Sequence, residues 1–180
     1  LTGIRIGILR EGFGIAGVSE SDVDAAVKEA ISVLEKVGAR ATEVSVPMHN
    51  DGLALWSAIA FEGATELMVR GDGYGTNWRG HYSTQLMDFY GRARRARGHD
   101  FSDTVKMTVL AGHYMSEQYN RHYYGKAQNI GRRLARDYDK ALQEYDLLIM
   151  PTTAMKAVKR PADKSLNSTL AGALSNLHNT

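Results

Sequence analysis

The sequence predicts an α/β fold, with a mixed sheet, flanking helices and a parallel β-α-β unit at its N-terminal end. Three observations within the first 47 of the 180 residues predict that unit. Apolar residues alternate with other residues over 4–9, recur at helical spacing over 21–37, and alternate again over 42–46. A strand, a helix and a strand this close together predict a right-handed parallel crossover.

Residues that cap helices or end strands set the expected bounds of these elements. Ser19 or Ser21 is expected to cap the helix, because a serine oxygen accepts a hydrogen bond from an amide of the first helical turn. Gly38 is expected to follow the end of the helix, since glycine readily adopts the left-handed backbone found there. Pro47 should stop the second strand, because it lacks the N–H that a sheet ladder needs.

The region 50–145 is predicted to be helical. Apolar residues keep helical spacing over 50–69, and a glycine-rich loop follows to residue 80. Ser83 and Ser102 are expected to cap two further helices. A long helix is predicted from about Met115 to Leu142, where apolar positions again keep helical spacing.

The region 146–180 contains the third predicted strand. A short continuous apolar run over 147–150, closed by Pro151, is typical of a strand buried on both faces. A loop and a helix of small residues near 169–177 complete the region. Because Leu1 is not a methionine and the chain stops inside a weakly helical stretch, we expect residues 1–180 to be one segment of a larger domain.

The composition is that of an ordinary globular protein, with 43% hydrophobic and 23% charged residues. A net charge of +2 is too small to favour nucleic acid as a partner. The absence of cysteine excludes disulfides and thiolate metal sites, and it fits a cytoplasmic protein. No stretch approaches the roughly 18 uninterrupted apolar residues that span a bilayer. Residues 1–10 lack the layout of a secretory signal, so no membrane partner is expected.

Gly12, Gly14 and Gly17 spell G-x-G-x-x-G behind the first strand, which is the outline of a dinucleotide-binding turn. In such a turn the third glycine lies in the first turn of the helix, whose free amides bind pyrophosphate. Here the helical pattern begins only after Gly17, and its first turn carries three acidic residues that would repel phosphate. The pattern therefore favours a connecting loop, with a nucleotide-binding module as the alternative.

Other polar clusters have simple structural interpretations. The arginine run over 92–97 lies on an amphipathic helix between Asp88 and Asp100, which favours a solvated face with ion pairs over nucleic-acid binding. The histidines lack the spacing of a helical pair of metal ligands, so each is expected to be structural or exposed and no metal site is predicted. No G-x-S-x-G elbow is present. Helical spacing indicates core packing for the tyrosines at 114, 119, 123, 124 and 138.

Several phrases together resemble the amidase signature family, which includes bacterial amidases and the amidase subunit of the glutamyl-tRNA amidotransferase. The most specific phrase is YYGKAQNIGRRLARDYDKAL followed by YDLLIMPTT. The others are the opening Leu1-x-Gly3-x-Arg5-Ile6-Gly7-Ile8, AISVLEKVGARATEVSVP, and GDGYG. The resemblance runs from Leu1 to about Ala154. Within the family, REGFG, LWSAIAFEG and GDGYGTNW look like the amidases associated with nitrile hydratases.

The resemblance implies hydrolysis of small aliphatic or aromatic amides to a carboxylate and ammonia, in a cytoplasmic enzyme of nitrile metabolism. It implies a serine nucleophile, a second serine on a cis peptide and a lysine, with no cofactor and no metal. In the family those residues belong to a stretch that comes before the position of Leu1. We therefore expect this segment to hold no catalytic residue, to supply fold and pocket wall, and to be inactive alone.

The resemblance assigns two residues to the pocket wall. Trp56, in ALWSAIA, matches a position that presents an aromatic ring to the acyl group, with simple core packing as the alternative. Tyr74 aligns with a tyrosine of the amidotransferase loop. The amidotransferase branch has an arginine early in the helix at 105–110, where this sequence has Lys106 and Met107, which disfavours glutamine specificity.

The expected partner is thus a small-molecule amide, without nucleic acid or membrane, and the resemblance allows a homodimer. Two other classes stay open at this point. One is the nucleotide-binding module built on the three glycines, and the other is a non-catalytic interaction domain that docks through the arginine helix.

Overall fold

The computed structural model describes residues 1–157, 159, 177 and 179. These residues form two compact units, of which the first holds Leu1–Leu53 and the described residues from Ile130 onward. The second unit is Ala54–Asn129. The division into regions 1–47, 50–145 and 146–180 of one larger domain stays a prediction, and most of the helix expected near 169–177 lies outside the described residues.

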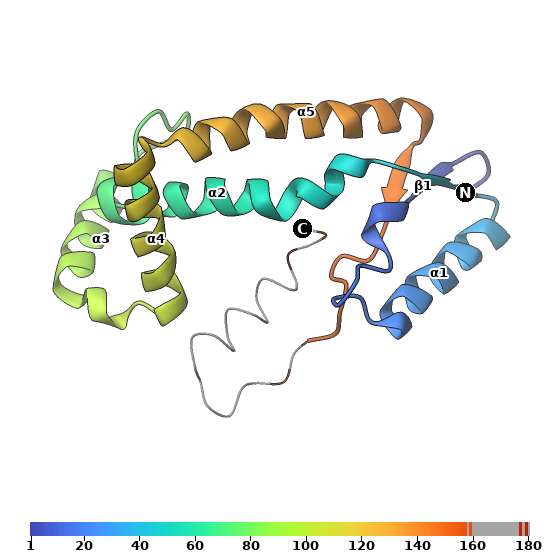
Figure 1. The fold of residues 1–180 in the computed structure, drawn as a ribbon, viewed down its shortest axis with the longest axis horizontal. Coiled ribbons are helices and arrows are strands. Elements are labelled where there is room, and N and C mark those ends of the chain that lie inside the picture. The colour runs from blue at the N-terminus through green and yellow to red at the C-terminus, as the bar shows by residue number, and fades with distance from the viewer. Residues whose placement is uncertain (158, 160–176, 178, 180) are drawn as a thin grey trace. The chain divides into compact units, whose positions relative to one another are not determined.

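The first unit contains a three-stranded parallel sheet in the order β2-β1-β3. Figure 1 labels its central strand, β1. The strands of this sheet are β1 (Arg5–Leu9), β2 (Arg40–Val44) and β3 (Leu147–Ile149). The central strand β1 pairs in parallel with both neighbours, so that Gly7 lies opposite Thr42 on one side and Leu148 on the other. The predicted α/β class and its parallel β-α-β unit are confirmed.

Helix α1 (Ser21–Lys36) connects β1 to β2, but the predicted serine cap is wrong. Glu20 is the N-cap residue, and its side chain makes no capping hydrogen bond. The Ser19 hydroxyl instead accepts a hydrogen bond from the Ile15 amide at 2.8 Å, so it closes the preceding loop. Gly38, at φ 99°, directly follows the C-cap residue Val37, as predicted.

The second and third strands differ from their predictions for identifiable reasons. Strand β2 ends at Val44, because the Val46 amide donates to a carboxylate oxygen of Glu11 at 3.0 Å rather than to a neighbouring strand. The predicted burial of the third strand on both faces is wrong for the described residues. Leu147 is 41% exposed, since packing against that face of β3 is incomplete among these residues.

The core of the first unit lies between the sheet and α5 (His122–Glu144). Its centre is formed by the buried side chains of Leu9, Val46 and Ala141. Partly buried side chains surround this centre, namely Val44, Leu134, Tyr138, Leu148 and Met150. The apolar stripe of α5 therefore faces β1, as its helical spacing indicates.

The second unit is helical. Its elements are α2 (Gly52–Ala64, which begins in the first unit), a π-helical stretch (Thr65–Arg70), α3 (Thr84–Arg97), α4 (Asp103–Tyr119) and the start of α5, up to Asn129. A short 3-10 helix lies at Gly98–Asp100 in this unit, and two others lie in the first unit at Arg10–Gly12 and Pro47–Asp51. Ser83 and Ser102 cap α3 and α4 as predicted, each accepting from an amide three residues later at 3.4 Å.

The predicted long helix over 115–142 is two helices. Helix α4 ends at Tyr119, and α5 begins at His122. Between them Asn120 and Arg121 have φ angles of 49° and 58°, a left-handed backbone that ends an α-helix. The Arg121 guanidinium pairs with the Glu66 carboxylate at 2.6 Å, so a distant contact holds this corner.

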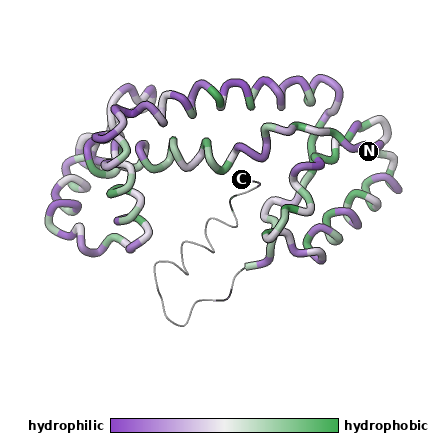
Figure 2. The backbone as a smooth tube through the Cα atoms, viewed as in Figure 1, coloured by the Kyte–Doolittle hydropathy of each residue, from purple (hydrophilic) through white to green (hydrophobic). Residues whose placement is uncertain are grey.

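Hydropathy differs sharply between two of the helices. Figure 2 shows that α2 is mostly apolar, whereas α5 is mostly hydrophilic. The continuous helical stretch Pro47–Arg70 has 24 residues and contains an 18-residue window with a mean hydropathy of 1.2, so by length and composition alone it could cross a membrane. This is weak evidence, because the core helix of a soluble protein passes the same test. The absence of a membrane partner stays a prediction.

Candidate functional site

Most amides of the loop between β1 and α1 already donate hydrogen bonds inside the molecule. The Gly14 amide donates to Asp24 Oδ2 at 2.9 Å, and the Glu20 amide donates to the Ala154 carbonyl at 2.9 Å. The Lys156 ammonium lies against the Glu20 and Asp22 carboxylates, and its hydrogen bond lowers the pKa of Asp22. A bound pyrophosphate would need free amides and would meet this acidic turn. The geometry therefore favours the connecting loop.

Each of the three glycines in the G-x-G-x-x-G pattern has a structural reason. Two of them adopt a left-handed backbone, and the third packs closely against another residue. Gly14 and Gly17 have φ angles of 61° and 74°, which side chains rarely tolerate. A Cβ on Gly12 would lie 2.6 Å from Met150 Cβ, just beyond the end of β3. The G-x-G-x-x-G pattern thus has a structural cause without a nucleotide.

A polar cluster surrounds Glu11 at the carboxyl ends of β1 and β2. Its Oε1 accepts from the Ser45 hydroxyl at 2.5 Å, and its Oε2 accepts from the Val46 amide at 3.0 Å. Burial by itself raises the pKa of Glu11, but the hydrogen bonds from Ser45 and Val46 outweigh burial and lower that pKa. Ligands of open parallel sheets usually bind at this edge, which makes the cluster a candidate site.

Close to this cluster, His49 is buried with a hydrogen bond on each ring nitrogen. Its Nδ1 lies 2.6 Å from the Tyr138 hydroxyl, and its Nε2 lies 3.0 Å from Asn179 Oδ1. Burial, together with the charge of Glu11, raises the pKa of Tyr138 and keeps its hydroxyl protonated. His49 is thus a satisfied structural histidine, as predicted.

Both residues that the sequence assigns to a pocket wall lie in the second unit. Trp56 projects from α2 and is 45% exposed, so it is not core among the described residues. Tyr74 lies in the loop before α3, half-buried, with its ring 5.6 Å from that of Tyr82. Neither position tests a role in substrate binding, and that role stays a prediction.

A polar seam between α2 and α4 escaped sequence reasoning. Glu62 is only 1% exposed, and its Oε2 accepts from the Ser116 hydroxyl at 3.1 Å. Thr65 Oγ1 donates to the Val109 carbonyl at 2.8 Å, directly after α2. Gly112 allows this approach, because a Cβ there would lie 1.9 Å from the Phe61 carbonyl oxygen. We call this contact the polar seam. It holds together α2, from which Trp56 projects, and α4, and its residues are Phe61, Glu62, Thr65, Val109, Gly112 and Ser116.

The seam left a signal that sequence reasoning could have used. Glu62 is an acidic residue inside a mostly apolar helix, and the small residues Gly112 and Ser116 lie four apart on one helical face. Glu62 Oε1 has no hydrogen-bond partner among the described residues.

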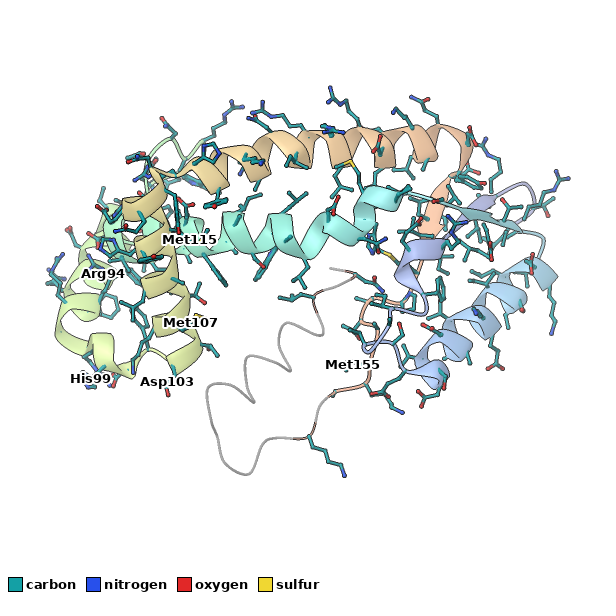
Figure 3. All side chains as sticks on the ribbon, in the orientation of Figure 1. Arg94, His99, Asp103, Met107, Met115 and Met155 are labelled. Carbon is teal, nitrogen blue, oxygen red and sulfur yellow. The ribbon has the colours of Figure 1, made fainter. Side chains whose placement is uncertain are left out.

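The arginine helix α3 carries internal ion pairs. Arg94, labelled in Figure 3, binds Asp72 at 2.7 Å, and its side chain is 19% exposed. Arg97 binds Asp100 at 2.5 Å, as the sequence indicates. Arg94 and Arg97 line a cavity of about 290 Å³ with Tyr90 and Phe101, yet both guanidinium groups already have carboxylate partners. These pairs weaken the case for phosphate binding there.

Among the described residues, the predicted core packing is wrong for three of the tyrosines. Tyr114, Tyr119 and Tyr123 are 58%, 43% and 46% exposed and form a ladder of edge-to-face contacts. The helix break at 120–121 changes the helical phase, so these rings meet one another at the corner instead of entering a core.

Lys106, at the position noted for glutamine specificity, pairs with Asp103 at 3.4 Å, and Met107 follows it on α4 (Figure 3). Among residues 1–157, 159, 177 and 179, no group of three or more His, Asp and Glu side chains is arranged to hold a metal ion.

Comparisons with known proteins match one family over nearly the whole chain. The family model described as Amidase matches residues 1–178. An enantioselective amidase from Rhodococcus rhodochrous is 39% identical over 179 residues, which are 99% of this chain and 34% of that protein. A glutamyl-tRNA(Gln) amidotransferase subunit from Shouchella clausii is 36% identical over 160 residues, 88% of this chain and 32% of that protein.

The fold is also similar to a solved structure, that of a glutamyl-tRNA(Gln) amidotransferase subunit from Thermotoga maritima. The similarity covers 98% of this chain and 33% of that one, with a TM-score of 0.57 and 17% identity. At this identity the likeness concerns the fold alone. The chain spans about a third of the length of the curated relatives that it matches.

Proposed function

The chain belongs to the amidase signature family, and from that premise we propose that it is part of an enzyme that hydrolyses small aliphatic or aromatic primary amides. The products are a carboxylate and ammonia. The observation that carries the proposal is the 39% identity to an enantioselective amidase along 99% of this chain. The segment LWSAIAFEG, which contains Trp56, resembles the amidases associated with nitrile hydratases and supports this substrate class.

In this proposal the catalytic residues lie in other parts of the polypeptide, since no residue here matches their motif. A neutral lysine takes a proton through the serine on the cis peptide, and the nucleophilic serine attacks the carbonyl carbon. Backbone amides of a glycine-rich loop hold the oxyanion. No metal or organic cofactor is required, and the 180-residue chain alone has no amidase activity.

The proposed contribution of this segment is one wall of the acyl pocket. Trp56 suits that role because the residue is 45% exposed among the described residues, although it lies on a mostly apolar helix. An exposed indole gains by covering the aliphatic or aryl group of a substrate. The hydrogen bonds of the polar seam hold the end of α2 against α4, and Tyr74 is the second proposed wall residue.

A second candidate substrate is glutamine, favoured by the relatives named as amidotransferase subunits. Against it, the position where that branch has an arginine carries Lys106, already paired with Asp103, and then Met107. Glutamine therefore ranks second. A cytoplasmic homodimer acting in nitrile metabolism remains part of the proposal.

The test requires a longer amidase polypeptide that carries these residues, assayed for ammonia release. We expect activity on propionamide and benzamide, less on glutamine, and none from the 180-residue chain. Absence of ammonia from both simple amides would contradict the substrate class, and activity of the 180-residue chain would contradict the assignment of catalysis to other parts.

The pocket wall is tested in the same polypeptide by Trp56→Ala. This change should raise KM or shift the preference between aliphatic and aryl amides, because the acyl group loses apolar contact. Phe89→Ala, at a 64% exposed aromatic residue of α3, is the matched control and should leave both unchanged. Kinetics unaltered by Trp56→Ala would reduce the role of Trp56 to packing.

A further inference from the structure

A carboxamide is buried at the carboxyl edge of the sheet, where three separate segments hold it. The Asn179 residue is 8% exposed. Its Oδ1 lies 3.0 Å from His49 Nε2, and its Nδ2 lies 2.8 Å from each of two carbonyl oxygens, those of Gly12 and Pro151. Both N–H bonds of the amide and its oxygen are therefore satisfied.

The polarity of each contact follows from the groups involved. The carbonyls of Gly12 and Pro151 can only accept, so the NH₂ end of the amide must face them. The oxygen that remains carries no hydrogen, and His49 Nε2 must therefore donate to it. In the neutral imidazole Nδ1 is then the acceptor, and the Tyr138 hydroxyl donates to it at 2.6 Å.

The arrangement matches one functional group. The site presents two acceptors, the carbonyl oxygens of Gly12 and Pro151, and one donor, His49 Nε2. A primary carboxamide has the matching groups, two N–H donors and one acceptor oxygen, in one plane. A carboxylate would place a negative oxygen against the two carbonyl oxygens, and a tertiary amide has no N–H for them. Each of these alternatives would leave buried carbonyls unpaired.

The location is also one where ligands are expected. Gly12 follows the end of β1, and Pro151 lies two residues beyond β3, so both carbonyls stand at the carboxyl ends of adjacent parallel strands. Open parallel sheets usually bind ligands at this edge.

We propose that His49, with the carbonyls of Gly12 and Pro151, forms a binding site for primary carboxamides, which the side chain of Asn179 occupies. Without that side chain the site accepts a small primary amide such as acetamide. The site requires no catalytic residue, so it stands whether or not the longer polypeptide hydrolyses amides.

The test uses the 180-residue chain with Asn179→Ala and acetamide as the probe. We expect saturable shifts of the His49 imidazole NMR resonances and a higher melting temperature, with half-saturation in the millimolar range for so small a ligand. Acetate and N,N-dimethylacetamide are the matched probes and should have neither effect. The unsubstituted chain should not respond to acetamide at the same concentrations, because Asn179 fills the site. A folded Asn179→Ala chain that ignores acetamide, or responds equally to all three probes, overturns the proposal.

A measurement on the unsubstituted chain covers the case in which Asn179→Ala does not fold. Nitrogen-15 NMR should show His49 with its hydrogen on Nε2, as the hydrogen-bond chain requires. The side-chain NH₂ of Asn179 should exchange with solvent at least about tenfold more slowly than that of the exposed Asn77. The other tautomer, or equal exchange at the two asparagines, overturns the proposal.

Discussion

Replacing Gly112 by alanine should open the seam between α2 and α4. The added Cβ would lie 1.9 Å from the Phe61 carbonyl oxygen and 2.5 Å from Thr65 Oγ1. Backbone cannot yield as the end of a flexible side chain does, so the two helices must separate by roughly 1 Å or more to restore van der Waals contact. That movement stretches the Thr65–Val109 bond, now 2.8 Å, and the Glu62–Ser116 bond, now 3.1 Å, beyond useful length.

The size of the effect follows from these contacts. Overpacking costs about 1–3 kcal/mol, and each lost hydrogen bond about 1 kcal/mol. Alanine recovers about 1 kcal/mol of helix propensity relative to glycine. The free energy of unfolding of the second unit should therefore fall by about 2–4 kcal/mol.

Hydrogen exchange measures this change locally, because the protection of the α2 and α4 amides reports the stability of the unit that contains them. Gly125→Ala on α5 is the matched control. Nothing lies within 4 Å of a Cβ there, so the same substitution should stabilise the unit by about 1 kcal/mol or less. If Gly112→Ala increases protection as Gly125→Ala does, the close approach of α2 and α4 is refuted.

Two predictions concern the first unit. Leu9→Ala should lower the free energy of unfolding by about 2–5 kcal/mol, measured by urea denaturation. The reason is that Leu9 is fully buried against Val46 and Ala141. A loss below about 1 kcal/mol would contradict this core. For pH dependence, the hydrogen bond from Arg5 lowers the pKa of Asp146 from 3.8 to about 2, so the ionised carboxylate adds stability above about pH 4 that disappears as the pH falls through about 2. Asp146→Asn should flatten that acid limb in a pH series of melting temperatures, and an unchanged limb would refute the assignment.

Local signals in the sequence predicted most of the elements. The alternation over 4–9 and 42–46 and the helical spacing between them identified the parallel unit, because side-chain periodicity follows directly from backbone geometry. Ser83 and Ser102 were identifiable as caps, since a cap bonds to an amide only three residues away. Local signals failed where a more distant group competes. The Glu66 carboxylate pairs with Arg121 at the break between α4 and α5. At the start of α1, the amide of the N-cap residue Glu20 donates to the Ala154 carbonyl, and no serine caps the helix.

The sequence by itself determined the fold class, the parallel crossover and the resemblance to amidases. It did so through patterns that span a few residues and through segments that match the family's sequence motifs. Only the tertiary structure decided which polar groups meet. Tyr138 and Asn179 are separated from His49 by 89 and 130 residues, and Ser116 is separated from Glu62 by 54. No periodicity reports contacts at such separations, because chain folding alone brings these groups together. Burial then requires each donor to find an acceptor, and that requirement defines the carboxamide site.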